Sequence, residues 1–277
     1  MKIYKNFNID KKFKNSAIAI GNFDGFHLGH QRVIKKGKEI AKKNNLKFGL
    51  MVFQPLPVMF FNKKLKNYRI DTLKQKILSS KKYKIDFLII KKFDKKFSKI
   101  KSHHFIKKNL YKKLNAKYIF VSNNFRFGNK REGNVNQLIE YEKKYNYKII
   151  KPIPFKKKNK IISSTFVRKL LINGKVRTAS KLLKRNWSIE GVVEKGREIG
   201  KTLGFPTCNI DIKNYVLAKP GVYAVKIYQK NKIFPSKGVA NLGYRPTFNQ
   251  KKIILEVHIF NFSGNLYNKH LTIEFID

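Results

Sequence analysis

The sequence predicts an α/β domain with a doubly wound parallel sheet over residues 1–185, followed by a small antiparallel six-stranded β-barrel over residues 186–277. Short apolar runs alternate with helical patterns through the first part, which is typical of a parallel sheet with helices on both faces. At Trp187 the side-chain period changes from 3.6 to 2. Closely spaced strand patterns without long helices follow, and these favour a small barrel.

The first domain opens with a polar, basic lead-in of residues 1–15, expected to form a short strand or arm. Its buried strands are expected at residues 18–21, 47–53, 86–90, 118–121 and 147–150. The intervening helices are expected to begin near His30 and to cover residues 72–80, with Asp71 as the cap, 102–114 and 136–145. Parallel sheets bind ligands at the carboxyl ends of their strands. The turn after the first strand, residues 55–57 and the loop 122–133 therefore belong to the binding edge.

Two short helices lead into the barrel. The first is introduced by residues 162–165 and runs to about residue 172, and the second covers about residues 175–184. The lysine run at 156–160 is expected to be a solvated loop. The barrel strands are expected at residues 187–193, 207–211, 222–228, 238–242, 253–260 and 271–276.

Composition limits the function classes. No apolar run approaches the roughly 20 residues of a membrane helix, and the N-terminus has no apolar signal segment. The single Cys208 excludes an internal disulfide and fits a reducing, cytoplasmic location. The net charge is +47, but only nine of the 63 basic residues are Arg and the lysines are spread along the chain. This distribution favours an overall drift of the composition toward lysine over a basic surface stripe that binds nucleic acid. The charge would still attract anions such as ATP.

The stretch from residue 18 to residue 30 indicates a strand, a turn and a helix start. Gly21, Gly25 and Gly29 permit a tight turn and the close approach of a ligand. His27 and His30 lie at the mouth of the helix, where unpaired N–H groups and the helix dipole favour a phosphate. Two imidazoles there would donate to the charge that develops on a phosphorus centre under attack. An isolated His-x-x-His pair, however, is usually a pair of surface histidines.

The whole string is more specific. Residues 21–30, read as Gly-x-Phe-Asp-Gly-x-His-x-Gly-His, resemble the signature of the nucleotidylyltransferase superfamily in its flavin-adenylating branch, which has a Rossmann-like fold. The resemblance implies that His27 and His30 stabilise the transition state. It also implies an ATP-binding turn made of Gly21, Asn22, Phe23, Asp24, Gly25 and Gly29.

Two further strings of this domain match the same family. Ser163, Ser164, Thr165 and Arg168 could be an ordinary helix cap with a surface arginine, but they resemble the family's triphosphate-binding Ser-Ser-Thr-x-x-Arg. The loop of Asn124, Phe125, Arg126, Phe127 and Gly128 resembles Asp-Phe-Arg-Phe-Gly, which is associated with flavin binding. Asn124 replaces the usual Asp. Gln54 and Leu56 stand where the family tends to have Glu and His, so ionisable groups are lost at three positions.

The barrel domain has a Gly-Lys-Thr that is not a P-loop, because three residues and not four separate Gly196 from Gly200. The segment resembles the Gly-x-x-x-Gly-x-x-x-Gly-Phe-Pro-Thr-Ala-Asn string of riboflavin kinases, with Cys208 at the Ala position. The implied ATP-binding residues are Gly196, Gly200, Lys201 and Gly204, and Thr207 and Asn209 would hold Mg²⁺. Glu256 would point outward by strand alternation alone, whereas the resemblance of residues 255–258 to Leu-Glu-Val-His makes it the general base.

The resemblance covers nearly the whole chain and is to the bifunctional riboflavin kinase/FAD synthetase family of bacteria. It implies ATP-dependent phosphorylation of riboflavin to FMN and adenylylation of FMN to FAD, with Mg²⁺ as the metal. The family usually has a further C-terminal helix beside the flavin pocket. This sequence, which runs to Asp277, is expected to lack that helix. Three alternatives stay open: an FMN adenylyltransferase with an impaired kinase domain, another nucleotidylyltransferase, and a basic RNA-binding protein on a degenerate scaffold. No membrane partner is expected, nucleic acid is disfavoured, and the oligomeric state is left open.

Overall fold

The computed structural model describes residues 1–157, 159–195, 207–212, 215–229, 233–247 and 250–277. These residues form two compact units. Unit 1 consists of Met1–Leu65 and Asp71–Ile162, and unit 2 consists of Lys66–Ile70 and Ser163–Asp277. The predicted boundary between residues 185 and 186 rests on the change of side-chain period, and it stays a prediction.

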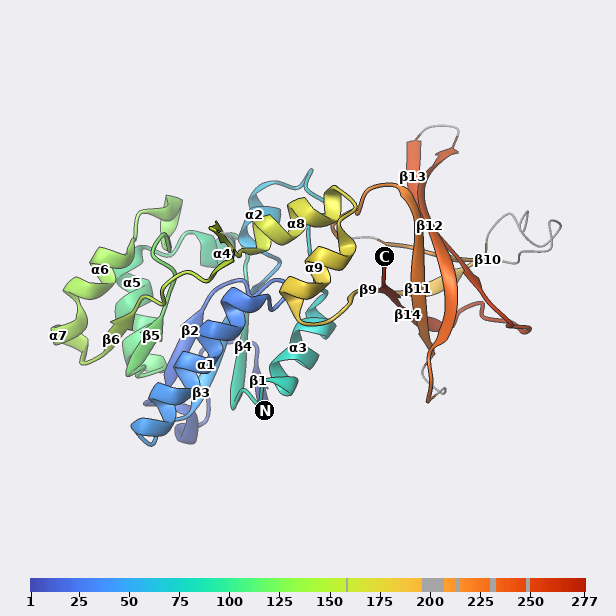
Figure 1. Ribbon diagram of the computed structural model, residues 1–277. Coiled ribbons are helices and arrows are strands. Elements are labelled where there is room, and N and C mark those ends of the chain that lie inside the picture. The colour runs from blue at the N-terminus through green and yellow to red at the C-terminus, as the bar shows by residue number, and fades with distance from the viewer. Residues whose placement is uncertain (158, 196–206, 213–214, 230–232, 248–249) are drawn as a thin grey trace. The chain divides into compact units, whose positions relative to one another are not determined.

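Unit 1 is built on a six-stranded sheet with the order β1-β4-β3-β2-β5-β6, in which every neighbouring pair is parallel (Figure 1). The strands are β1 (Lys2–Tyr4), β2 (Ala17–Ile20), β3 (Phe48–Gln54), β4 (Phe87–Lys92), β5 (Tyr118–Phe120) and β6 (Lys148–Ile150). The predicted doubly wound parallel sheet is confirmed. The order reverses between β2 and β5, so the loops that follow these two strands flank the switch point at which such sheets bind ligands.

Helices connect the strands of unit 1. They are α1 (Leu28–Lys43), α2 (Pro57–Phe61), α3 (Leu73–Lys82), α4 (Lys95–Ser98), α5 (Ser102–His104), the π-helix η2 (Phe105–Lys113), α6 (Val135–Glu140) and α7 (Glu142–Tyr145). Two 3₁₀ turns, η1 (Lys11–Phe13) and η3 (Asn129–Arg131), complete the unit together with the short strands β7 (Lys156–Lys157) and β8 (Lys160–Ile161).

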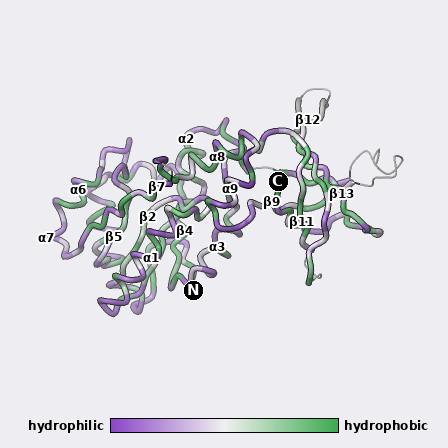
Figure 2. Tube along the Cα trace, in the orientation of Figure 1, coloured by the Kyte–Doolittle hydropathy of each residue, from purple (hydrophilic) through white to green (hydrophobic). Residues whose placement is uncertain are grey.

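Both faces of the sheet are buried, and successive side chains of a strand point to opposite faces. Ala17 and Ala19 of β2 belong to a core with Ile34 and Ala41 of α1. Ile18 and Ile20 belong to a second core, which includes residues of η2 and α6. Figure 2 shows hydrophobic residues along β2 and β4 and hydrophilic residues along α7. This two-sided burial fixes β2, and with it the start of the turn that carries the histidines.

The structure corrects several sequence predictions for unit 1. The cap of α3 is Thr72 and not Asp71, because Thr72 forms a reciprocal capping box with Gln75. Helix α1 begins at Leu28, earlier than predicted. The region 136–145 contains two helices, the region 102–114 is mostly π-helix, and α2 and α4 were not predicted. The lysine run at 156–160 is not a plain loop, since β7 and β8 pair as an antiparallel ribbon.

Unit 2 contains two helices and a closed barrel. The helices are α8 (Ser164–Ile172) and α9 (Val176–Leu183). The barrel has the order β10-β13-β12-β11-β14-β9, and its pairs are antiparallel. Its strands are β9 (Trp187–Glu194), β10 (Thr207–Ile210), β11 (Gly221–Gln229), β12 (Ser236–Thr247), β13 (Gln250–Ile259) and β14 (His270–Phe275). The predicted six-stranded antiparallel barrel is confirmed, with β12 longer than expected.

Within the described part of the chain, no helix is long and apolar enough to cross a membrane.

Candidate active sites

The turn between β2 and α1 is strained and buried. Phe23, Gly25 and Phe26 all have positive φ values, of 44°, 91° and 46°. Residues other than glycine rarely adopt positive φ values, and those that do cluster at functional sites. The rings of Phe23 and Phe26 are almost completely buried, and so is Asp24. The buried rings of Phe23 and Phe26 therefore anchor the turn at the edge of the sheet.

The two predicted histidines meet at the start of α1. His27 is the N-cap of the helix, and its Nδ1 accepts a hydrogen bond from the backbone N–H of His30 at 3.4 Å. The two imidazole rings stack with centroids 3.8 Å apart. Because Nδ1 of His27 is an acceptor, the neutral ring carries its proton on Nε2. The corner thus combines a ring N–H donor with the N-terminus of a 16-residue helix.

Lys76, which the sequence did not single out, and Asp71 brace this turn. The buried Lys76 of α3 donates to the carbonyl of Asn22 at 2.7 Å. The backbone N–H of Asp71 donates to Oδ1 of Asp24 at 3.2 Å. Asp71, predicted as a helix cap, therefore lies against the turn between β2 and α1. A lysine within an ordinary helical pattern carries no signal that it will be buried.

Gly29 is required by close approach. A Cβ at this position would lie 2.9 Å from the carbonyl oxygen of Ile162 and 3.0 Å from Cε1 of His27. No real side chain tolerates such a contact with backbone. The absence of a Cβ lets the backbone of Ile162, the residue before Ser163, come against the start of α1.

The Ser163–Arg168 string forms the beginning of α8. Ser163 is the N-cap, and its Oγ accepts from the backbone N–H of Phe166 at 3.2 Å. Ser164 and Thr165 occupy the first turn, where N–H groups point at an incoming anion. An ordinary helix cap would leave Arg168 at the surface, but only 7% of this residue is exposed. Its Nε donates to the carbonyl of Tyr68 at 2.9 Å, within the same unit.

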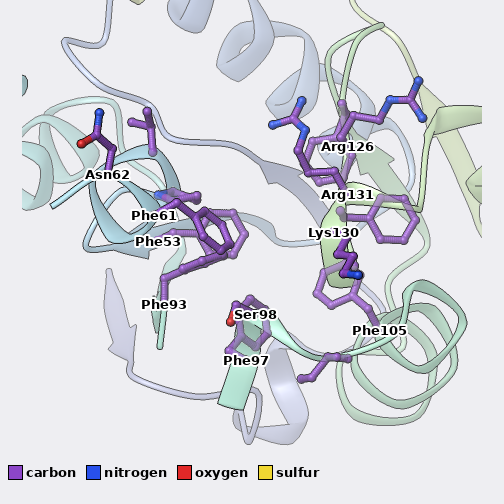
Figure 3. A pocket seen from close by; sticks show the side chains of 16 residues that line it. Phe53, Phe61, Asn62, Phe93, Phe97, Ser98, Phe105, Arg126, Lys130 and Arg131 are labelled. Atoms are coloured by element: carbon purple, nitrogen blue, oxygen red, sulfur yellow. The ribbon is translucent and has the colours of Figure 1, made fainter. Parts of the chain in front are cut away.

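An aromatic pocket of about 540 Å³ lies in unit 1. In Figure 3, Phe53, Phe61, Phe93 and Phe97 lie across the pocket from three cationic side chains, those of Arg126, Lys130 and Arg131. The phenylalanines are Phe53, Phe61, Phe93, Phe97, Phe105, Phe125 and Phe127. None of the described residues that line the pocket is acidic, so it suits a large planar ligand that carries a negative charge.

The structure places the predicted flavin residues on this pocket with one exception. Phe125, Arg126 and Phe127 line it, whereas Asn124 lines a smaller polar hollow, which shares Phe125, Arg126 and Arg131 with the pocket. Leu56, at the position where the resemblance led us to expect His, is buried. The phenylalanines of β3, α2, α4 and η2 were missed. Their only signal is that Phe53 and Phe93 stand at strand ends, on the predicted binding edge.

The barrel residues are brought together by strand register. Glu256 of β13 pairs with Asn209 of β10 on one side and with Asn241 of β12 on the other. Thr207 pairs with His258, two positions from Glu256. Leu255 and Val257 are fully buried, so the side chains between and beside them occupy the opposite face. Thr207, Asn209 and Glu256 therefore share one face of two adjacent strands.

The donor set on this face fits a hard cation. Oδ1 of Asn209 is buried and has no hydrogen-bond partner among the described residues. A buried oxygen acceptor without a donor costs free energy unless a ligand satisfies it. The described residues hold no cluster of three His, Cys, Asp or Glu side chains. The hydroxyl of Thr207 and the amide of Asn209 suit Mg²⁺, which binds few protein groups and keeps water and phosphate ligands.

A pocket that the sequence did not predict adjoins Thr207. It has a volume of about 510 Å³ and is lined by Val193, Thr207, Cys208, Val257, Ile259 and residues 262–267. Cys208 donates from Sγ to the carbonyl of Val257, and burial raises the pKa of its thiol to about 11. The thiol is therefore protonated at neutral pH and is no nucleophile. Gly196, Gly200, Lys201 and Gly204 lie outside the described residues.

A parallel-sheet unit with a histidine-capped helix, together with a barrel that presents a hydroxyl, an amide and a carboxylate, defines a two-domain class of phosphate-transfer protein. Family models agree: residues 9–166 match FAD synthetase, and residues 183–277 match riboflavin kinase. The chain belongs to the FAD synthetase family and carries a riboflavin kinase domain.

Relatives align with the chain over most of its length. A bifunctional riboflavin kinase/FMN adenylyltransferase of Buchnera aphidicola subsp. Schizaphis graminum is 43% identical over 96% of this chain and 86% of its own. The enzymes of the same name from Haemophilus influenzae and Escherichia coli K12 are 37% and 34% identical, over 97% and 93% of this chain and 87% and 82% of theirs. A crystal structure titled a macrolide-efflux protein from Streptococcus pneumoniae matches with a TM-score of 0.84 and 25% identity, covering 99% of this chain and 89% of that one.

Proposed function

We propose that the chain makes FMN and then FAD, with riboflavin kinase chemistry in the barrel and adenylyl transfer in the α/β domain. The observation that carries the adenylyl-transfer half is the stacked pair of His27 and His30 at the start of α1. That pair stands at the switch point of the same parallel sheet whose strand β3 ends at the aromatic pocket. The relatives that share both family matches are named for these two activities.

In adenylyl transfer, the phosphate of FMN attacks the α-phosphate of ATP and pyrophosphate leaves. No side-chain nucleophile is needed, because the FMN phosphate is already anionic. Nε2–H of His27, together with His30, donates to the oxygens that gain charge in the transition state. Ser164, Thr165 and Arg168 bind the β- and γ-phosphates through helix N–H groups and a guanidinium. The turn of residues 21–25 and Gly29 gives the nucleotide room to approach the backbone.

The aromatic pocket supports the flavin half of this reaction. An isoalloxazine ring is planar and largely apolar, so the phenylalanines suit its faces. The positive charges of Arg126, Lys130 and Arg131 suit a phosphorylated flavin over a neutral one. Asn124, in the neighbouring polar hollow, offers an amide to the same ligand.

In the kinase reaction, Glu256 accepts the proton of the riboflavin 5′-hydroxyl as that oxygen attacks the γ-phosphate of ATP. Thr207 and Asn209 would hold Mg²⁺, which neutralises charge on the phosphates. We assign the pocket beside Thr207 to the adenosine of ATP, because its lining is mostly apolar and it adjoins the proposed phosphate side. Gly196, Gly200, Lys201 and Gly204 complete the ATP site in this proposal.

The decisive experiment supplies the purified chain with riboflavin and Mg-ATP and identifies the flavins by chromatography. We expect FMN followed by FAD. His30→Ala is expected to lower FAD formation about 10²- to 10³-fold and to leave FMN formation unchanged, since the two reactions use separate residues. Equal loss of both products would contradict two sites.

The same assay tests the alternative of an impaired kinase domain, and an RNA-binding assay tests the scaffold alternative. FAD from supplied FMN, with no product from riboflavin, would reduce the function to adenylyl transfer. Tight, salt-sensitive RNA binding without ATP turnover would favour the scaffold alternative. We propose small-molecule substrates without a nucleic-acid partner, and a cytoplasmic location.

A further inference from the structure

The segment Lys66–Ile70 stands between α2 and α3 in the sequence, yet it belongs to unit 2. Backbone and side-chain bonds fasten it there. Val216 donates its backbone N–H to the carbonyl of Arg69 at 2.7 Å. The indole N–H of the fully buried Trp187 donates to the carbonyl of Ile70 at 3.2 Å. The segment is thus anchored on the residue after Tyr68 and on the next one, which fixes the backbone at Tyr68.

Tyr68 contacts Arg168 in two ways. Its carbonyl oxygen accepts from Nε of Arg168 at 2.9 Å. Its ring lies under the guanidinium, with Cζ of Arg168 3.8 Å from the ring centroid. A hydrogen bond in the guanidinium plane and a stack on its face together fix both the direction and the tilt of that plane. A lysine could not be held in this way, because its ammonium has neither a plane nor a stacking face.

Nε and the two terminal nitrogens lie on different edges of a guanidinium. Since Nε points at the carbonyl of Tyr68, the orientation of the edge that carries the terminal nitrogens is set by the same contacts. A phosphate is bound through that edge, with two parallel N–H···O bonds.

We infer that Tyr68 is a positioning residue for adenylyl transfer, which orients Arg168 toward the β- and γ-phosphates of ATP. The inference rests on the proposed role of Arg168. It assigns to the α2–α3 connection a part in ATP binding that the motif strings of the chain do not include. Tyr68 itself touches no substrate in this account and acts only through Arg168.

The competing explanation is that the Tyr68 ring only fills space beside α8. A space-filling ring would affect folding stability and both activities alike. A positioning ring affects the KM for ATP in FAD formation, leaves the KM for FMN and the kinase rate unchanged, and acts only while Arg168 is present.

The test is a double-mutant cycle on the full chain, with FMN supplied so that the kinase step is bypassed. Tyr68→Leu removes the aromatic face at similar bulk, and Tyr68→Phe keeps it. We expect Tyr68→Leu to raise the KM for ATP about 2- to 30-fold with kcat little changed, and Tyr68→Phe to stay within about twofold of the parent. Arg168→Ala is expected to raise the same KM about 10- to 100-fold, and Tyr68→Leu should add nothing in that background.

Thermal midpoints and FMN formation from riboflavin serve as controls, and Tyr68→Met replaces Tyr68→Leu if that variant does not fold. An unchanged KM for ATP in Tyr68→Leu overturns the inference, and so does an effect of equal size with and without Arg168. If Arg168→Ala itself leaves the KM for ATP unchanged while FAD is still made, the proposed role of Arg168 is what fails.

Discussion

The two candidate sites are built by different means. In unit 1, the site residues stand on the turn with three positive-φ positions, Phe23, Gly25 and Phe26, and on the start of α1, braced by buried groups such as Lys76. In the barrel, Thr207, Asn209 and Glu256 stand inside regular strands, and the ladder alone makes them neighbours. The first site depends on local backbone strain and the second on register. The two should therefore respond independently to substitution.

Glu256→Gln gives the largest expected effect. The amide keeps the size of the carboxylate but cannot accept the hydroxyl proton, so FMN formation should fall about 10²- to 10⁴-fold. FAD formation from supplied FMN should be unchanged, as measured by chromatography of the products. A parallel loss of FAD formation would show that the two sites are not independent.

The buried thiol of Cys208 tests the barrel alone. Burial raises the pKa of the thiol from its ordinary value near 9 to about 11. The unfolded chain therefore loses this proton at lower pH than the folded chain, so the thiol's contribution to the free energy of unfolding falls as pH rises from about 9 to about 11. The loss corresponds to about 2 to 3 kcal/mol at the end of that range.

Cys208→Ala is the matched variant, because it lacks this ionisation. Denaturant unfolding of both proteins near pH 8 and near pH 10.5 should show a steeper loss of stability in the parent chain. Identical pH dependence in the two would mean that the thiol is not buried as described.

Phe61→Ala gives the smallest expected effect and sharpens the assignment of the aromatic pocket. Phe61 lines the pocket but is 66% exposed, so its loss should not unfold the domain. One lost aromatic contact should raise the KM for FMN about 2- to 10-fold with the kinase rate unchanged. Phe234→Ala, at a barrel residue that is 82% exposed, is the control and should leave the KM for FMN as it is.

The fold was largely predictable because burial leaves a regular trace in the sequence. β2 and the first four residues of β4 are continuous apolar runs, and β13 alternates around Glu256, so strands and barrel could be placed. What could not be predicted depends on contacts between distant segments. The stacking of Arg168 on Tyr68, the hydrogen bond from Lys76 to the turn, and the pocket wall formed by Phe97 and Phe105 leave no periodic pattern in the sequence.

Capping was misjudged for a related reason. Asp71 and Thr72 are both good caps, and only the reciprocal bond with Gln75 decides between them. The motif strings located the histidine corner and the Thr207–Glu256 face. They did not reveal that His27 itself is the N-cap of α1.

The pairing of Glu256 with Asn209 and Asn241 has a consequence for anyone who alters the length of the chain in the barrel. Side chains of a strand change face at every residue, so one residue added to or removed from β13 would turn the carboxylate into the apolar interior and bring a leucine or a valine out. Insertions inside these strands must come in even numbers, while single ones belong in the connecting turns.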